Sequence, residues 1–342
     1  MRSIVIGGNF GDAIKASSIM EQISLKLKSE LINGGTIETL IAASNVLNYD
    51  LVLWSVNVPN DVEKIYPKKS NGSVLFCTKV IRENRNFGDA VARIFKMNAN
   101  AVIAIDSSAK PFKFDLIDAL GNNWCSTTNV EELVTGMLKI YNWTKGSIRI
   151  KSNKTQLNTY DKNLDVLCNI VKIIADKVEN ERGGRYFGNV STRCSKLFPS
   201  MKINDDLILV SARNSSKERL SSEDFVFTQL INNEVAYNGD KKPSVDTPIQ
   251  LNLYNRFKEI NFIVHGHAYI KEADFTEHYY PCGDLRELLA IEQKLSSNPN
   301  SFVLNLKNHG FIIGTNSLES LRYYADNLLF TYRRIGEEKI EW

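Results

Sequence analysis

The sequence lacks the features that mark membrane, secreted and nucleic-acid-binding proteins. None of its apolar runs, over 342 residues, approaches the length needed to span a bilayer. The start, Met1 to Gly7, goes directly into a strand-like pattern without the long apolar region of a signal peptide. A net charge of only +3 does not favour nucleic acid as a partner. These absences predict a cytoplasmic protein that binds neither membrane nor nucleic acid.

Cysteine and histidine are also scarce. The five cysteines are odd in number and include no Cys-x-x-Cys pair, which indicates reduced thiols rather than a disulfide framework. They are Cys77, Cys125, Cys168, Cys194 and Cys282. The chain has four histidines, and two of them lie one residue apart.

The length suggests two domains, because 342 residues exceed a typical single domain. Residues 146–161 are polar, cationic and weakly periodic, as is typical of a linker. In residues 1–145, short apolar runs alternate with helical patterns, which predicts a parallel-sheet α/β domain of the Rossmann-like or flavodoxin-like type. Residues 162–342 form the second domain, for which the pattern predicts a sheet flanked by helices.

The apolar periodicity predicts strands and helices in both parts. In the first part, strands are expected at 3–6, 50–55, 73–78 and 101–105, and helices at 13–31, 36–47, 87–97 and 130–141. In the second part, strands are expected at 207–211, 224–228, 262–268, 302–306 and 311–314, and helices at 164–181, 247–257, 284–295 and 317–332.

A glycine-rich stretch from Gly7 to Asp12 follows the first predicted strand and precedes a helix. A turn at such a place can hold a phosphate at the helix N-terminus. The stretch is not a Gly-x-Gly-x-x-Gly motif, and a tight turn without a ligand is the alternative. Lys79, Arg82 and Arg85 either add positive charge at the same sheet edge or belong to a solvated loop. The ligand of the first domain is not predicted.

His265 and His267 flank Gly266 in a run predicted to be a strand, so their side chains should point the same way. Such a pair commonly offers two nitrogen ligands to Zn²⁺ or a similar metal. His309 falls, before Gly310, in a predicted tight turn between two apolar strands. Three histidines and an open position are typical of a catalytic zinc site. The alternative is two surface imidazoles and a turn histidine.

Several short motifs follow one another in the second part of the chain. They lie at residues 188–193, 207–211, 217–225, 242–248, 263–269, 281–283 and 308–310. In this order they resemble the class II aldolase/adducin family, from about residue 162 to the end. The resemblance implies an α/β/α sandwich. It does not fix the reaction, since this fold hosts aldolases, epimerases, dehydratases, decarboxylases and non-catalytic adducins.

The resemblance also implies metal ligands and an acid/base group. His265, His267 and His309 match the family's three ligands, whose metal stabilises the enediolate formed from a ketose phosphate. Asp246 occupies the position of the family's acid/base glutamate with a side chain shorter by one methylene. Three roles stay open for it: a repositioned base, a fourth metal ligand, or only the cap of a helix that starts at Thr247.

The family's phosphate pocket is matched in part. Gly188 and Asn189 match its Gly-Asn motif, with the alternative that Asn189 only stabilises a turn. Arg213 and Asn214 stand where the family has a Thr-Gly turn, and Ser244 is followed by valine where the family has two serines. Arg213 is either a charged contact for phosphate or carboxylate, or an exposed loop arginine.

The expected function is therefore a zinc-dependent lyase of the aldolase type that acts on a small phosphorylated sugar. A metal-dependent dehydratase or epimerase is the first alternative, and a non-catalytic adducin-like binding protein is the second. The family builds its active sites at subunit interfaces, which implies a homo-oligomer, with a tetramer favoured. Tyr279 and Tyr280 are either proton donors or packing residues, and His278 is expected on the surface.

Overall fold

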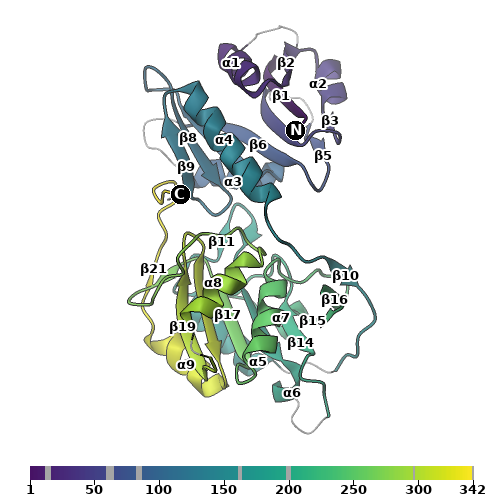
Figure 1. Cartoon of the computed structure of the whole chain (residues 1–342), viewed down its shortest axis with the longest axis vertical. Helices are drawn as coiled ribbons and strands as arrows, with labels where there is room; N and C mark the ends of the chain where they lie inside the picture. Colours follow the sequence, from purple (N-terminus) through teal and green to yellow (C-terminus); the bar gives the residue numbers. More distant parts are fainter. Residues whose placement is uncertain are drawn as a thin grey trace. The chain divides into compact units, whose positions relative to one another are not determined.

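A computed structural model describes residues 1–11, 17–58, 65–81, 87–160, 164–197, 202–295 and 297–340. The chain divides into two compact units (Figure 1). Unit 1 comprises Met1–Gly146 and Arg334–Trp342, and unit 2 comprises Ser147–Arg333. Asp12, which ends the glycine-rich stretch, lies outside the described residues, and so do Arg82 and Arg85, for which added charge at the sheet edge and a solvated loop were the two alternatives. Each helix in the described ranges is too short or too polar to cross a membrane.

Unit 1 is built on a seven-stranded sheet in the order β2-β1-β4-β6-β7-β8-β9. The strands from β2 to β7 in this order pair in parallel, and β8 and β9 pair antiparallel at one edge. The prediction of a parallel α/β unit is confirmed. The strands are β1 Ser3–Phe10, β2 Glu30–Gly35, β4 Leu51–Asn57, β6 Val74–Ile81, β7 Ala101–Asp106, β8 Lys113–Asp118 and β9 Asn123–Thr127, with the short pair β3 Asn45–Val46 and β5 Lys68–Lys69 beside them.

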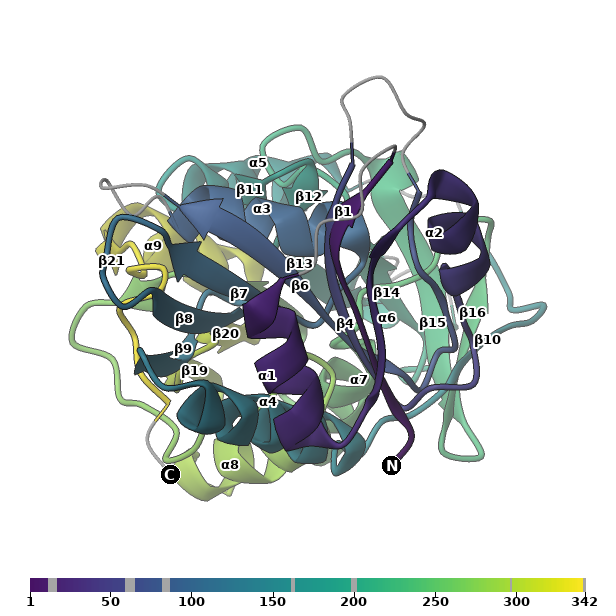
Figure 2. The same ribbon diagram turned by 90° about the horizontal axis from the view of Figure 1, so that it is seen from above.

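Helices cover both faces of this sheet (Figure 2). The buried side chains of α2 and α3 join one apolar cluster with one face of the sheet, whereas α1 packs against α4 on the other. The helix predicted at 87–97 matches the observed α3. The helices are α1 Ser18–Leu27, α2 Ile37–Ala43, α3 Phe87–Met97 and α4 Val130–Lys145.

The glycine-rich stretch is not the turn that the sequence suggested. The first strand, expected at 3–6, continues to Phe10, so Gly7 and Gly8 lie within the sheet. A Cβ atom on Gly7 would collide with the side chain of Met20 in α1. Glycine at this position therefore allows close packing of a helix on a strand, and the turn predicted at Gly7, with or without a phosphate, is wrong.

Two further expectations for unit 1 are corrected by the structure. The helix expected at 13–31 ends at Leu27, because Lys28 takes a left-handed conformation with φ of 51° and the next residues pair with β1 as strand β2. Lys79 lies within β6 rather than beyond the strand, since the pairing of β6 with β7 extends through it.

The C-terminal segment belongs to unit 1, whereas the sequence assigned it to the second domain. The backbone N–H of Gly336 donates to the carbonyl of Gly121 (2.7 Å), and that of Asn123 donates to the carbonyl of Glu338 (2.8 Å). The Asn123 side chain also donates to the carbonyl of Gly336 (2.9 Å). These hydrogen bonds fix the segment against the loop before β9, so the division differs from the expected 162–342.

Unit 2 is built on an eight-stranded sheet in the order β10-β16-β15-β14-β13-β17-β20-β19. Its strands pair antiparallel, except that β10, from the expected linker, pairs in parallel with β16. The strands are β10 Ser152–Lys154, β13 Asn189–Arg193, β14 Ile208–Ser211, β15 Phe225–Ile231, β16 Glu234–Asn238, β17 Phe262–Gly266, β19 Ser301–Leu306 and β20 Gly310–Thr315. Four short strands form two further ladders, β11 Glu181–Arg182 with β12 Arg185–Tyr186 and β18 Tyr269–Ile270 with β21 Phe330–Thr331.

Two helical layers enclose this sheet. Buried residues of α5 and α9 share one core with one face of the sheet, and those of α7 and α8 share a second core with the other face. In β17, Val264 faces the first core and Ile263 faces the second, as strand alternation requires. This is the expected α/β/α sandwich. The helices are α5 Asp165–Ala175, α6 Cys194–Leu197, α7 Thr247–Arg256, α8 Arg286–Lys294 and α9 Leu318–Asn327, with a 3₁₀ turn at Ser222–Asp224.

One helix and one strand in unit 2 end earlier than the sequence predicted. The helix expected at 317–332 ends at Asn327, because Phe330–Thr331 pair with β18. The strand expected at 262–268 ends at Gly266, one residue before His267.

Arg193, at the end of β13, is held inside unit 2 by backbone carbonyls. Its side chain donates to the backbone carbonyls of Ile260 (2.9 Å), Asp205 (2.9 Å) and Tyr254 (2.6 Å). The residue is 2% exposed, and its guanidinium lies 5.0 Å from the centre of the Tyr254 ring. Arg193 therefore fastens the strand that also carries Asn189 to the start of β17.

We predict that Arg193→Lys lowers the free energy of unfolding by about 3 kcal/mol, because a lysine leaves some of these buried carbonyls without a donor. Arg322→Lys on the exposed face of α9, where Arg322 pairs with Asp326 at 2.8 Å, is the matched control and should change stability by less than about 0.5 kcal/mol. Urea unfolding measures both variants. Equal changes in the free energy of unfolding of Arg193→Lys and Arg322→Lys would contradict a structural role for Arg193.

Candidate metal centre

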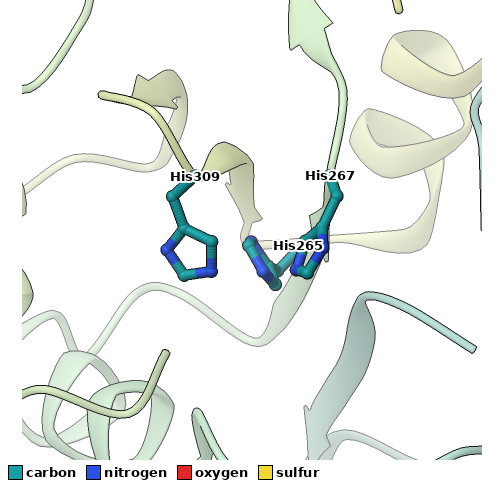
Figure 3. Close-up of side chains that lie close together, drawn as sticks. All are labelled: His265, His267 and His309. Carbon is teal, nitrogen blue, oxygen red and sulfur yellow. The ribbon is translucent and has the colours of Figure 1, made fainter. Parts of the chain in front are cut away.

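Three imidazoles converge at one end of the sheet of unit 2. His265 is the penultimate residue of β17, His267 follows that strand, and His309 lies in the turn between β19 and β20. Their candidate ligand atoms all lie within 4.8 Å of one another. The ring centres are 4.8–5.3 Å apart, and Figure 3 shows the three rings facing a common point.

Glycines allow the backbone to come this close. Gly188 has φ of +70°, and a Cβ atom there would collide with the carbonyl oxygen of His265. A Cβ atom on Gly310 would likewise collide with the carbonyl oxygen of Gly266. Both positions therefore exclude a side chain for steric reasons, and Gly188 needs glycine for its left-handed backbone as well.

The hydrogen bond of His265 fixes its tautomer. Nδ1 lies 2.8 Å from the carbonyl oxygen of Phe311, and since a carbonyl can only accept, Nδ1 carries the proton. Burial, followed by the nearby His309, lowers the pKa of His265 to about 4, so the ring is neutral. The Nε2 lone pair then points into the site, where this buried atom has no hydrogen-bond partner among the described residues.

His309 is oriented in the same way by a carboxylate. Its Nδ1 lies 2.6 Å from Oε1 of Glu287 in α8, and both side chains are buried. Burial alone would lower the pKa of His309, but the charge of Glu287 outweighs it and raises the pKa well above its usual value. Nδ1 donates to the carboxylate, which leaves Nε2 directed toward the other two histidines. A carboxylate behind a histidine is a common arrangement around metal ligands.

His267 is held by stacking. Its ring lies 5.0 Å from that of Phe187 at an interplanar angle of 20°. Burial, and then the neighbouring His265, lower the pKa of His267 well below its usual value. A neutral imidazole at this place retains a lone pair for a metal.

Asp246 is the N-cap residue of α7, but its side chain does not cap the helix. The backbone carbonyl of Asp246 accepts from Ile249 (3.0 Å) and Gln250 (3.2 Å), as in any helix start. Its carboxylate instead accepts from the Asn189 side chain (3.1 Å) and lies 3.9 Å from Nε2 of His265. Oδ1 has no hydrogen-bond partner within the part of the chain that the structure describes. The carboxylate therefore faces the imidazoles.

Asn189 orients this carboxylate. Its side-chain amide donates to Oγ of Ser244 (3.0 Å) and to Asp246, and its Oδ1 accepts from Gln250. Asn189 is 1% exposed. The structure thus brings Gly188, Asn189, Ser244 and Asp246 together with the histidines, and the amide of Asn189 is engaged in hydrogen bonds to protein groups.

The Arg213–Asn214 turn lies at the rim. Asn214 has φ of 64°, a conformation that favours glycine, and its Oδ1 accepts from the backbone N–H of Tyr186 (2.8 Å). Arg213 is exposed, although it is near enough to Asp246 for that charge to act on it. Burial of part of its side chain lowers the pKa of Arg213.

Sequence reasoning assigned no site role to three residues. Cys282 Sγ lies 3.3 Å from Nε2 of His309, and Glu287 binds the other nitrogen of that ring. Lys217 is 5% exposed and lines one cavity with Asn189 and His267. An acidic residue on the apolar face of a predicted helix was the signal for Glu287. Lys217 and Cys282 lie in the motifs at 217–225 and 281–283 that carry the family resemblance, which assigned neither residue a role.

The segment before Pro281 carries Tyr279, Tyr280 and His278. The Arg286 guanidinium lies 5.3 Å from the centre of the Tyr280 ring, which gives Tyr280 a packing contact. Tyr279 is buried, and His278 is exposed, as expected.

The donor set fits a divalent metal ion. Three imidazoles provide the nitrogen ligands that zinc prefers, and the hydrogen bonds of His265 and His309 through Nδ1 direct Nε2 of both rings into the site. A buried nitrogen without a partner, such as Nε2 of His265, calls for an explanation, and a bound metal ion supplies one.

Residues 169–271 match the family model described as Class II Aldolase and Adducin N-terminal domain. Comparison with curated proteins gives no match.

Among solved structures, the chain is similar to an L-fuculose 1-phosphate aldolase at 18% identity, with 49% of this chain and 84% of that chain covered and a TM-score of 0.35. The N-terminal class II aldolase domain of a protein from Thermoplasma acidophilum matches at 13% identity, with 51% and 96% covered and a TM-score of 0.33. A DNA/pantothenate metabolism flavoprotein from Streptococcus pneumoniae matches at 12% identity, with 41% and 97% covered and a TM-score of 0.32.

Lys217 gives a prediction about stability. Its ammonium donates to the carbonyl of Ser215 (2.6 Å), and burial lowers the pKa of Lys217 from 10.5 to about 8. The folded state thus holds this proton less tightly than the unfolded chain does. The cost is about 3 kcal/mol, fully present below pH 8 and lost as the pH rises toward about 10.5. Lys217→Met should therefore raise the free energy of unfolding at pH 7, and the gain should shrink at pH 10.

Urea unfolding at the two pH values tests this prediction, with Lys172→Met on the exposed face of α5 as the control expected to change little. A Lys217→Met protein that is less stable than the wild type at pH 7 would show that the ammonium has a stabilising partner.

Proposed function

We propose that unit 2, which carries a domain of the class II aldolase and adducin family at residues 169–271, is a divalent-metal enzyme of the lyase type acting on a small phosphorylated sugar. The observation that supports this most strongly is the orientation of two imidazole rings. Phe311 and Glu287 each accept from a histidine Nδ1–H, which directs both Nε2 atoms to one point beside the Asp246 carboxylate.

His265, His267 and His309 would hold the metal, and zinc suits three imidazoles. When bound, such an ion acts as a Lewis acid that polarises a carbonyl group and stabilises developing negative charge on its oxygen. A scaffold protein has no use for three converging imidazoles, two of them oriented by hydrogen bonds through Nδ1, so this set favours an enzyme over a non-catalytic binding protein.

Asp246 would transfer the proton. In cleavage of an aldol, a base removes the proton of the hydroxyl group on the carbon beyond the bond that breaks. The carbon that bears this hydroxyl becomes a carbonyl carbon. The electron pair of the broken bond goes to the ketose fragment, which is later protonated. Oδ1 of Asp246, which has no partner within the described residues, is free to accept such a proton, while Oδ2 is held by Asn189.

The anionic end of the substrate needs positive charge. Lys217 lines the same cavity as His265 and His267 and is kept buried despite its cost to stability. Residues that reduce stability are often retained for binding or catalysis. We propose that Lys217, with Arg213 and Asn214 at the rim, binds the phosphate, and that Ser244 contributes a hydroxyl.

A homo-oligomer, most simply a tetramer, completes this proposal, because the family builds its sites between subunits.

Metal binding is the first test. We expect the purified protein to bind about one Zn²⁺ per chain, and His265→Ala to weaken binding, because it removes one of three nitrogen ligands. His278→Ala is the matched control, since His278 is exposed, and should bind as the wild type does. Calorimetric titration of the metal-free protein measures all three. Equal affinity in the wild type and His265→Ala would place the metal elsewhere.

The second test concerns Asp246. Ketose 1-phosphates are screened for release of dihydroxyacetone phosphate, and Asp246→Asn is then compared with the wild type on the best substrate. Loss of a well-placed acid/base group typically costs about 10²–10⁴ in rate, with metal content unchanged. Asp326→Asn on the surface of α9 controls for the substitution type and should be fully active. An unchanged rate in Asp246→Asn would assign the proton transfer to another group.

A further inference from the structure

We propose that Cys282 is a fourth protein ligand of this metal, so that the resting site is a His₃Cys set. The inference rests on the proposed function, in which the three histidines bind the ion. It gives the Cys282 thiol a role that the family resemblance did not suggest. Cys282 and Asp246 lie with His309 in a second group whose candidate ligand atoms are within 4.8 Å of one another. This group and the three histidines share His309.

The distance between the sulfur and the shared histidine fits one common ion. Sγ of Cys282 lies 3.3 Å from Nε2 of His309. A zinc ion lies about 2.3 Å from a sulfur ligand and about 2.0–2.1 Å from a nitrogen ligand, so two such ligands at a tetrahedral angle are about 3.6 Å apart. The observed separation is close to this value.

The turn that carries Cys282 is closely packed. Gly283 has φ of +75°, and a Cβ atom there would approach the carbonyl oxygen of Val245 to 2.7 Å, so this turn packs directly on the segment before Asp246. Asp284 is fully buried, and its carboxylate accepts from the N–H of Arg286 (3.1 Å) at the start of α8. These contacts of Gly283 and Asp284 therefore hold the Cys282 thiol at the site.

One short stretch of chain holds both nitrogens of His309. Cys282 faces Nε2, and Glu287, on the first turn of α8, accepts from Nδ1. A second, independent observation also indicates a bound ion. The His265 side chain is 3% exposed, and its Nε2 has no hydrogen-bond partner in the described part of the chain. A thiol alone would not satisfy that lone pair, whereas an ion shared by the histidines and Cys282 would.

The ligand set has chemical consequences. When Cys282 binds, its S–H bond is lost, the sulfur donates a pair to the ion, and the proton passes to solvent. Thiolate and imidazole favour Zn²⁺ and Co²⁺ over Mg²⁺ and Mn²⁺, which prefer oxygen ligands. Four protein ligands also close the tetrahedral site, so a substrate must displace the thiolate or enter as a fifth ligand.

Cobalt spectroscopy tests the proposal directly. Metal-free full-length protein is titrated with Co²⁺. We expect the visible bands of bound Co²⁺ together with a near-ultraviolet thiolate-to-cobalt charge-transfer band. Cys282→Ser should keep the visible bands and lose the charge-transfer band, with weaker Co²⁺ binding. Cys125→Ser, a change at a half-buried cysteine of unit 1, is the matched control and should keep both.

The outcomes separate this proposal from the proposed function. Visible bands without a charge-transfer band in the wild type would overturn the role of Cys282 and leave the histidine site intact. A charge-transfer band that persists in Cys282→Ser would also overturn it. An absence of any bound Co²⁺ would overturn both proposals. Alkylation adds a readout that needs no variant: Zn²⁺ should protect Cys282 from iodoacetamide, whereas a thiol acting as a nucleophile with His309 as its base would react without regard to Zn²⁺.

Discussion

The orientation of two buried imidazoles is the constraint on which the site depends. A neutral histidine has one proton for two nitrogens, and whichever group accepts that proton decides where the lone pair points. The Phe311 carbonyl accepts it from His265 and the Glu287 carboxylate accepts it from His309. Both rings therefore aim Nε2 at the same point as His267, in a region where burial disfavours a charged imidazole at His265 and His267.

The surrounding fold maintains this orientation. The Phe311 carbonyl belongs to β20, which pairs with β17 opposite His265, so the sheet itself supplies the acceptor. Gly188 lets the loop before β13 lie directly against the backbone of His265. Arg193 then fixes the far end of β13 to the segment that leads into β17. The same strands that form the core of unit 2 thus bring the candidate ligand atoms of the three imidazoles within 4.8 Å of one another.

Much of the fold and part of the site followed from the sequence. Apolar alternation is a local property, so strands such as β17 and β20 and a helix such as α3 were predicted close to their observed bounds. The strands β8 and β9 were missed because their sequences contain buried Asp115 and Asn123, whose pairing with each other is visible only in three dimensions. The bounds at Gly7 and Leu27 were wrong because packing on Met20 and pairing of β2 with β1 override local turn signals.

The residues of the site also fall into two groups, those that local sequence indicated and those that only the structure shows. His-x-His spacing and motif order drew attention to the histidines and Asp246, since these depend on neighbouring residues in the chain. Sequence gave no reason to connect Cys282 and Glu287 with His309, which lies more than twenty residues away along the chain. Whether Asp246 caps its helix or faces the site was likewise decided only by the direction of its side chain.

The central claim is that these fixed lone pairs bind one metal ion. Crystals of the zinc-loaded protein, measured on both sides of the zinc absorption edge, test it most directly. We expect one anomalous peak in unit 2, within bonding distance of Nε2 of His265 and His309 and of a nitrogen of His267. A well-ordered site without such a peak, in crystals whose protein has bound zinc in solution, would contradict it.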